Sequence, residues 1–241
     1  MATSEVPIVL VHGGGHGAWC WAPTLGLLDG SVIAVDLPPV SIRGGPGRNE
    51  MPEGIDELTV ADWADSVLAA ADGAGFDRFV LVGHSLAGLT IGEVARARPD
   101  RVAHLVFVSA LAPRQGENAL SAMAPEMMER VSGGLTDEVV AELFCNDMDA
   151  TQTQFVFDRF GTDAAQVMLE PIDRVGIPPE LPKTYVRLAR DQALTPAAQE
   201  ASIAALRAVP GGTVDIKDID SGHNVMISHP AELARVIQDL R

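Results

Sequence analysis

A serine, an aspartate and a histidine stand where they could act together on a carbonyl carbon. Ser85, Asp191 and His223 follow one another along the chain, each at or shortly after the end of a strand-like run. A serine hydroxyl is a weak nucleophile until a neighbouring imidazole removes its proton, and that imidazole needs an acid to orient it. This order, with each residue in a loop after a strand, is typical of acyl-transfer sites on a parallel sheet.

The serine lies in a turn between a strand-like run and a helical pattern. Phe79–His84 is apolar apart from its last residue, and helical periodicity begins at Leu86. In a nucleophile elbow, strand and helix pass so close together that the residues two before and two after the serine must be small. Gly83 meets this requirement fully, and Ala87 meets it only approximately because the usual residue there is glycine. The short string is weak alone, but its position between two elements predicts Ser85 as the nucleophile.

The base and the acid are predicted from their positions after strands. His223 follows the run 213–219 and precedes the last helical pattern, and Asp191 follows the preceding strand-like run. Asp218 and Asp220 are nearer to His223 in sequence, but nearness in sequence does not provide the geometry that the imidazole Nδ1 requires. We interpret the other histidines as structural or solvent-facing: His12, His16, His84, His104 and His229.

Acyl transfer also needs two N–H donors for the charge that develops on the carbonyl oxygen. The backbone N–H of Leu86, directly after the serine, is predicted to be one of them. The glycine-rich loop 13–17, after the first strand, is predicted to supply the other because glycines let a backbone approach a substrate closely. A phosphate-binding loop is the alternative, but the spacing is not Gly-x-Gly-x-x-Gly and no Lys-Ser/Thr pair follows.

Six short apolar runs alternate with longer helical patterns along the chain. The runs predicted to be strands are 7–12, 31–37, 79–84, 102–110, 184–189 and 213–219. The patterns predicted to be helices are 59–74, 86–98, 197–208 and 230–240. This alternation predicts βαβ units and therefore an α/β fold, a doubly wound and mostly parallel sheet of about six strands covered on both faces.

The stretch 113–182 interrupts this alternation with several short helical patterns, including 119–131, 137–144 and 151–160, and no convincing strand. An insertion between two strands of a doubly wound sheet lies over its carboxyl edge. We therefore expect a core formed by residues 1–112 and 183–241, and a helical cap formed by residues 113–182. The apolar cap side chains most suited to an adaptable pocket wall are Met127, Met148 and Phe157. Packing of the cap onto the sheet is the alternative explanation for them.

Composition limits the partners and the compartment. The 241 residues include 33 acidic and 17 basic side chains, which give a net charge of −16 and argue against nucleic-acid and anionic-membrane partners. Cys20 and Cys145 provide no disulfide framework, and we interpret them as reduced structural thiols in a cytoplasmic protein. We expect no leader segment and no membrane span. The oligomeric state is left open.

These motifs together resemble the α/β-hydrolase superfamily, in particular the branch that contains plant methylesterases and hydroxynitrile lyases. The likeness rests on the runs 10–19, 82–86 and 222–223, and it covers essentially the whole chain. It implies Ser85, Asp191 and His223 as the triad, the backbone amides of Gly14 and Leu86 as the oxyanion hole, a small helical cap, and no cofactor or metal. Two departures are Ala87, where glycine is usual, and a sheet without the family's first two strands.

The predicted activity is hydrolysis of a small, largely apolar carboxylic ester by a cofactor-independent serine hydrolase. A lactonase, a hydroxynitrile-lyase-type enzyme on the same triad and a non-catalytic small-molecule receptor are the alternatives. The lyases in the resembling branch carry a threonine and a lysine where this chain has Gly13 and Asn224, which favours hydrolysis. Gly13, Asn224 and His16 complete the predicted pocket, together with the three cap residues named above.

Overall fold

The computed structural model describes residues 5–38, 55–123, 125–131, 134–161, 165–175, 177–209 and 212–241. Residues 1–4, on which the expectation of no leader segment depends, lie outside these ranges. So do residues 39–54 of the predicted core and a few positions of the predicted cap. Among the described residues, no helix has both the length and the apolar character that a membrane crossing requires.

Six parallel strands form a single sheet, as predicted. The strands are β1 (Ile8–Val11), β2 (Val32–Val35), β3 (Phe79–His84), β4 (Val102–Val108), β5 (Lys183–Leu188) and β6 (Asp215–Ile219). Their order across the sheet is β2-β1-β3-β4-β5-β6, and every neighbouring pair is parallel. Each predicted run corresponds to one strand, with ends that differ from the prediction by at most two residues.

The helices predicted between the strands are present. They are α2 (Val60–Gly73), α3 (Ala87–Ala97), α8 (Pro196–Arg207) and α10 (Pro230–Gln238). Helix α2 begins with a capping box, in which the Thr59 hydroxyl accepts from the Asp62 N–H and the Asp62 carboxylate accepts from the Thr59 N–H. Short elements escaped prediction because one turn carries little periodicity: η1 (Ala18–Trp21), α1 (Ala22–Leu25), η2 (Ile55–Glu57), η3 (Pro99–Arg101) and α9 (Val225–Ser228).

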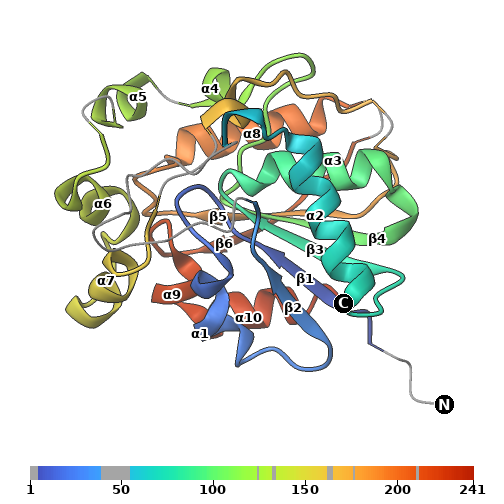
Figure 1. Cartoon of the computed structure of the whole chain (residues 1–241), viewed down its shortest axis with the longest axis horizontal. Helices are drawn as coiled ribbons and strands as arrows, with labels where there is room; N and C mark the ends of the chain where they lie inside the picture. Colours follow the sequence, from blue (N-terminus) through green and yellow to red (C-terminus); the bar gives the residue numbers. More distant parts are fainter. Residues whose placement is uncertain are drawn as a thin grey trace.

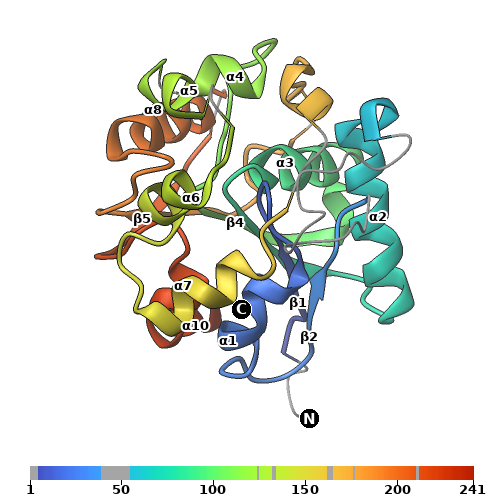
Figure 2. The same ribbon diagram turned by 60° about the vertical axis from the view of Figure 1, so that its left-hand side comes forward.

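The segment between β4 and β5 is helical throughout its regular parts. It contains α4 (Ala119–Ala122), α5 (Pro125–Val131), α6 (Asp137–Phe144), α7 (Ala150–Phe157) and η4 (Ala165–Leu169). The single helix predicted over 119–131 is two helices, α4 and α5. Figures 1 and 2 both show α5, α6 and α7 stacked in this order along one side of the molecule, away from α2.

Both faces of the sheet are buried at its centre, which explains why β1, β3 and β4 are apolar almost throughout, whereas the edge strand β6 is largely exposed and mixes charged and apolar residues. Successive side chains of a strand point to opposite faces, so Val9 joins one buried cluster while Leu10 joins the other. Helices α2, α3 and α8 cover the first face with residues such as Trp63, Leu89 and Ile203. Helices α9 and α10, with η1, cover the second face (Figure 1).

The strand order places a crevice where the chemistry was predicted. From β1 the chain moves outward to β2, then crosses back to place β3 on the other side of β1. Ligands of doubly wound sheets bind where the strand order reverses in this way, beyond the carboxyl ends of the strands. The glycine-rich loop leaves β1 at this point and Ser85 follows β3, so the fold brings the two segments together.

Candidate active site

Ser85 occupies the strained turn between β3 and α3. Its φ is +55°, in the left-handed region that residues other than glycine rarely adopt, and such a conformation costs about 1–3 kcal/mol. The surrounding backbone holds it: the Ser85 N–H donates to the Val108 carbonyl at 3.2 Å, and the Ser85 carbonyl accepts from the Leu111 N–H at 2.9 Å. Strain maintained by neighbours in this way is typical of a nucleophile elbow.

Close approach of strand and helix explains the small residues around Ser85, as predicted. The position after the serine that requires glycine is, however, one residue later than expected. A Cβ on Gly83 would lie 2.8 Å from Ile91 Cγ2 of α3, so only glycine fits there. Ala87 is fully buried, and its methyl group is accommodated. The position where no Cβ fits is instead Gly88, because a Cβ there would collide with the backbone carbonyl oxygen of Leu111. The alanine at position 87 therefore leaves the elbow intact.

The structure brings Asp191 and His223 together. Asp191 Oδ2 accepts a hydrogen bond from His223 Nδ1 at 2.7 Å, and both residues are only 1% exposed. The other oxygen, Oδ1, accepts from the backbone N–H groups of Ala193 and Leu194, each at 2.8 Å. These bonds fix the plane of the carboxylate and direct one oxygen at the imidazole, which is the role of the orienting acid in a triad.

Ser109 is a residue of the site that the sequence did not reveal. Its hydroxyl donates to Asp191 Oδ2 at 2.6 Å, so this oxygen receives both Ser109 and His223. Ser109 lies just after β4, with a φ of +37°, and its N–H donates to the Val186 carbonyl at 2.9 Å. In a structure, a non-glycine residue with positive φ indicates backbone strain of the kind found at functional sites. No sequence pattern predicts such a conformation at Ser109.

The two acids nearest His223 in sequence face away from it. Asp218 pairs with Arg187 at 2.7 Å and its side chain is 64% exposed. Asp220 pairs with Arg190 at 3.0 Å and its side chain is 82% exposed. The structure therefore favours Asp191 over both as the partner of the imidazole.

The second ring nitrogen of His223 is available for proton transfer. Nε2 is buried and makes no hydrogen bond within the described part of the chain. His223 and Ser85 line the same cavity, and so do Gly14 and Leu86, whose N–H groups were predicted to bind the oxyanion. The wall of one cavity therefore carries a serine hydroxyl, an imidazole held in one orientation, and two backbone segments.

The cavity has apolar walls and a volume of about 380 Å³. Among the described residues, none of those that line it is Asp, Glu, Lys or Arg. Its walls come mainly from the segment between β4 and β5 and from the loop after β5, including Met123, Met127, Leu135, Phe144, Phe160, Met168 and Leu194. A substrate in this space would lose its hydration without finding a counter-charge, so the cavity suits an uncharged, largely apolar molecule.

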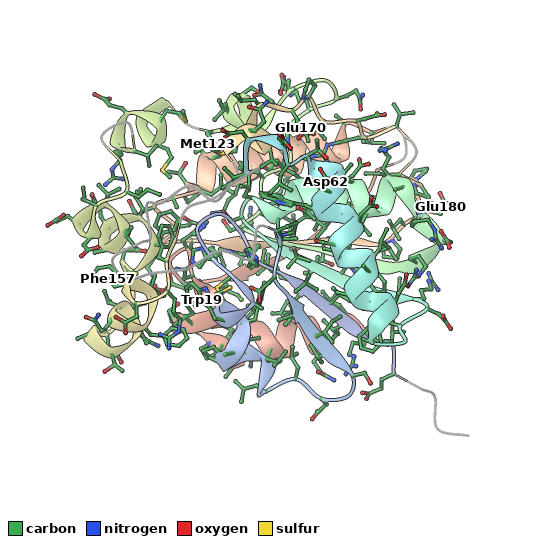
Figure 3. All side chains as sticks on the ribbon, viewed as in Figure 1. Trp19, Asp62, Met123, Phe157, Glu170 and Glu180 are labelled. Carbon is green, nitrogen blue, oxygen red and sulfur yellow. The ribbon has the colours of Figure 1, made fainter. Side chains whose placement is uncertain are left out.

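The predicted pocket residues are distributed in and behind this cavity. Met127 lines it, whereas Gly13, His16, Met148, Phe157 and Asn224 are not among its lining residues. A Cβ on Gly13 would lie 2.6 Å from Ser85 Cβ, and the His16 ring packs edge-on against Phe160. Met148 and Phe157 pack on the buried cluster of the second sheet face, and Figure 3 shows Phe157, the last residue of α7, well apart from Met123. Asn224 is fully buried directly after His223.

His84 contacts both the backbone and the ring of His223. Its Nε2 lies 3.0 Å from the His223 backbone carbonyl and donates to it, and the two rings are 4.5 Å apart. Burial, followed by the neighbouring His223 and His16 rings, holds the pKa of His84 well below its ordinary value. His84 therefore stays neutral and adds no positive charge beside the base.

This buried histidine should make stability depend on pH. When the pH falls below about 6.5, His84 takes up a proton in the unfolded chain but not in the native protein. The free energy of unfolding should then decrease by up to ~1.4 kcal/mol per pH unit. His84→Gln should flatten this dependence, as measured by urea unfolding at about pH 7.5 and about pH 5.5. An unchanged pH dependence in the variant would contradict the assignment.

Metal ligation finds no support in the described residues, which contain no group of three or more His, Cys, Asp or Glu side chains arranged around a common point. Both cysteines are buried and unpaired. Burial, with a contribution from the Asp147 charge, raises the pKa of Cys145 to about 12, so this thiol stays protonated and unreactive.

Several curated proteins resemble this chain in sequence. Probable esterase PIR7A of Oryza sativa subsp. indica is 36% identical over 126 residues, which are 51% of this chain and 45% of that protein. Methyl jasmonate esterase 1 of Vitis vinifera is 30% identical over 162 residues, 66% of this chain and 54% of that protein. A carbendazim hydrolyzing esterase of Nocardioides is 30% identical over 130 residues, 52% of each chain. The chain spans about half the length of the curated relatives it matches.

Solved structures share the fold over nearly the full chain. An extracellular alpha/beta-hydrolase from a Paenibacillus species superposes with a TM-score of 0.78 at 21% identity, covering 98% of this chain and 99% of the other. Polyneuridine aldehyde esterase superposes with a TM-score of 0.75 at 20% identity, covering 98% and 99%. The pyrethroid hydrolase PytH gives 0.75 at 22% identity, covering 97% and 96%. At these identities the likeness concerns the fold.

The family model described as "Alpha/beta hydrolase family" matches residues 8–236, nearly the whole chain. The matched part includes the strained serine turn, the glycine-rich loop, the loop that carries Asp191 and the loop that carries His223. With the six-stranded parallel sheet and the structural neighbours, this match confirms both the predicted resemblance and the predicted fold class. The chain is a member of the alpha/beta hydrolase family.

Proposed function

We propose that this protein is a cofactor-independent serine hydrolase that cleaves a small, largely apolar carboxylic ester. The observation that carries the proposal is the state of His223. Its Nδ1 is held by Asp191 at 2.7 Å, while its Nε2 has no partner among the described residues and shares a cavity with Ser85. This is the arrangement that a general base requires to take the serine proton.

In the proposed reaction, His223 removes the proton of Ser85 as the serine oxygen attacks the ester carbonyl. The backbone N–H groups of Gly14 and Leu86 stabilise the tetrahedral oxyanion. His223 then protonates the leaving alcohol, and an acyl-enzyme on Ser85 remains. A water molecule deprotonated by His223 hydrolyses this ester and restores the serine, while Asp191 holds the imidazole tautomer throughout.

The cavity supports a substrate without charge. Its walls are apolar, its volume of about 380 Å³ fits a small molecule, and the chain has a net charge of −16 that disfavours polyanionic partners. We propose that residues 113–182 form the cap that selects this substrate, because Met127, Leu135 and Phe144 of that segment face the cavity. The esterases among the relatives agree with this class of substrate.

Hydrolysis is favoured over cyanohydrin cleavage by the surroundings of the serine. A side chain at Gly13 would collide with Ser85, whose Cβ lies 2.6 Å from the position of a Gly13 Cβ. Asn224, directly after His223, offers a neutral amide where a lysine would offer a positive charge to a departing cyanide. Neither residue can therefore supply the groups that the lyase alternative was expected to need.

The test is a panel of p-nitrophenyl esters, methyl esters, lactones and mandelonitrile, run with a fluorophosphonate label on the serine. We expect turnover of small apolar esters, no comparable cleavage of mandelonitrile, and label on Ser85. Labelling of Ser85 without hydrolysis of any ester or lactone would overturn the proposed reaction. Mandelonitrile cleavage at the rate of the best ester would assign the lyase activity instead.

Substrate size should depend on Met127. Met127→Ala enlarges the cavity, so we expect kcat/KM for a bulky ester to rise relative to that for a small ester by on the order of 10-fold. Met148→Ala and Phe157→Ala are controls, because these side chains do not line the cavity and should change all esters in proportion. The measurement is kcat/KM across a graded ester series. Equal ratios in all three variants would show that Met127 only packs the segment.

A further inference from the structure

The turn after α6 contacts both loops that carry the proposed acid and base. We propose that Asp147, assisted by Asn146, is a positioning residue that keeps His223 at hydrogen-bond distance from Asp191. This inference rests on the function proposed above, since it assigns a support to two of its residues. Neither Asn146 nor Asp147 lines the cavity, so a substrate in that space would not be their partner.

Asp147 holds the segment that carries His223 at both of its ends. Its Oδ2 accepts from the Gly222 N–H at 2.6 Å, directly before His223, and from the Ser228 hydroxyl at 3.0 Å, at the end of α9. The Asp147 side chain is only 1% exposed, and hydrogen bonds to a buried carboxylate are stronger than those between neutral groups. A single oxygen atom, Asp147 Oδ2, therefore binds both the start and the end of the segment 222–228 that carries the imidazole.

A histidine and an arginine side chain also lie close to the Asp147 carboxylate. His229 Nδ1 lies 3.3 Å from Asp147 Oδ2, and an Arg190 guanidinium nitrogen lies 3.8 Å from it. Arg190 directly precedes Asp191 in the chain. The carboxylate thus lies between the loop of the proposed acid and the loop of the proposed base.

Asn146 adds a contact to the loop of the acid. Its Nδ2 donates to the Arg190 carbonyl at 2.9 Å, one residue before Asp191. The two loops are also joined directly, because the Arg190 N–H donates to the Ser221 carbonyl at 2.9 Å. Adjacent residues of one turn therefore bind the residue before Asp191 and the residue before His223.

Close packing fixes how this turn meets the His223 loop. A Cβ on Gly222 would lie 2.6 Å from Asp147 Oδ1 and would also collide with the Asn146 side-chain oxygen. There is no room for the loop to slide toward the turn, and the hydrogen bonds prevent it from moving away. Together with His84, which donates to the His223 carbonyl, the turn holds the backbone on both sides of the imidazole-bearing residue in sequence.

Loss of this contact should affect the chemical step more than substrate binding. A displacement of a catalytic group by about 1 Å can lower the rate by on the order of 100-fold. We expect Asp147→Ala to lower kcat by ~10–100-fold while KM for a small ester changes by less than about 2-fold. Asp147→Asn keeps an oxygen that can accept from the Gly222 N–H and should recover most of kcat.

The matched control is Asp149→Ala, two residues further along the same segment. Asp149 caps α7 by accepting from the Gln152 N–H at 2.8 Å, and within the described part of the chain it makes no hydrogen bond to the His223 loop. We expect this variant to lower the Tm without lowering kcat. Of the two side chains, only that of Asp147 contacts the loop that carries His223. A comparison of kcat and Tm in the two variants therefore separates loss of positioning from general destabilisation of the segment.

A readout that needs no substrate is the proton NMR resonance of the His223 Nδ1 hydrogen in its bond to Asp191. We expect this resonance in the wild type and in Asp149→Ala, and its loss or broadening in Asp147→Ala. Because it does not depend on turnover, it tests the positioning role even if the proposed ester hydrolysis fails. That failure would appear separately, as a wild type that hydrolyses no member of the ester panel.

Two results would overturn the inference. One is a folded Asp147→Ala variant with wild-type kcat and an unchanged His223 resonance. The other is an equal loss of kcat in Asp147→Ala and Asp149→Ala. If Asp147→Ala does not fold, Asn146→Ala takes its place, since it removes only the bond to the Arg190 carbonyl. A fall in kcat that Asp149→Ala lacks supports the inference, and an unchanged kcat contradicts it.

Discussion

Replacement of Ser85 by alanine should lower kcat on a small ester by ~10⁴-fold or more. The variant lacks the only oxygen that can form the proposed acyl-enzyme, whereas the cavity, His223 and the backbone donors remain. Alanine bears the positive φ at this position about as well as serine does, so the fold should persist. The measurements are kcat, the Tm, and the mass added by a fluorophosphonate. Turnover like that of the wild type would remove Ser85 from the mechanism.

Ser109→Ala is a matched control for that experiment. Ser109 is also a buried serine with positive φ at the end of a strand, but it donates to Asp191 and is not among the residues that line the cavity. Its loss removes one of four hydrogen bonds to the carboxylate, so kcat should fall far less than in Ser85→Ala. Labelling by the fluorophosphonate should persist in this variant and be absent in Ser85→Ala.

Asp191→Asn should lower kcat by on the order of 10⁴-fold, through the tautomer of the imidazole. The N–H groups of Ala193 and Leu194 require an oxygen at the position of Oδ1, which forces the new NH₂ group toward His223. An NH₂ group can only donate, so Nδ1 must become the acceptor and the proton must move to Nε2. The nitrogen that faces the serine then cannot accept its proton.

Asp218→Asn and Asp220→Asn are the controls for this prediction. Both side chains are exposed and pair with arginines at the surface, and such pairs contribute about 0–1 kcal/mol. We expect each variant to keep kcat within about 3-fold of the wild type. A larger loss in either variant than in Asp191→Asn would transfer the role of the acid to the loop beside His223.

The fold could be predicted because its signal is local and repeated. Strands buried on both faces are apolar almost throughout, as in β3, and the capping box at Thr59 marks the start of α2 within the sequence itself. The break between α4 and α5 was not predicted. Apolar side chains continue across it, so periodicity alone gave one helix over 119–131 where the chain forms two.

The positions of Ser85, Asp191 and His223 could be predicted because a strand precedes each of them, and this sheet topology brings the carboxyl ends of its strands to one edge. Ser109 and Asp147 carry no such mark, since each acquires its partner only through contacts 82 and 75 residues apart in sequence. The walls of the cavity were harder still. The sequence of a short helix does not indicate which of its sides faces the sheet. It was therefore not predictable that Met127 lines the cavity, whereas Met148 and Phe157 pack on the buried cluster behind it.

The contact between Gly13 and Ser85 has a consequence for how such a protein can change. Because a Cβ at position 13 would meet the Cβ of the serine, the loop after β1 and the turn after β3 cannot diversify independently. A mutagenesis library that varies position 13 alone should return almost no functional clones. A library that also varies His84 and the residues after Ser85 allows the turn to move away from position 13, and it should return some functional clones. Evolution toward a new side chain beside the nucleophile therefore requires paired substitutions in segments more than 70 positions apart, which makes that route rarely accessible by single steps.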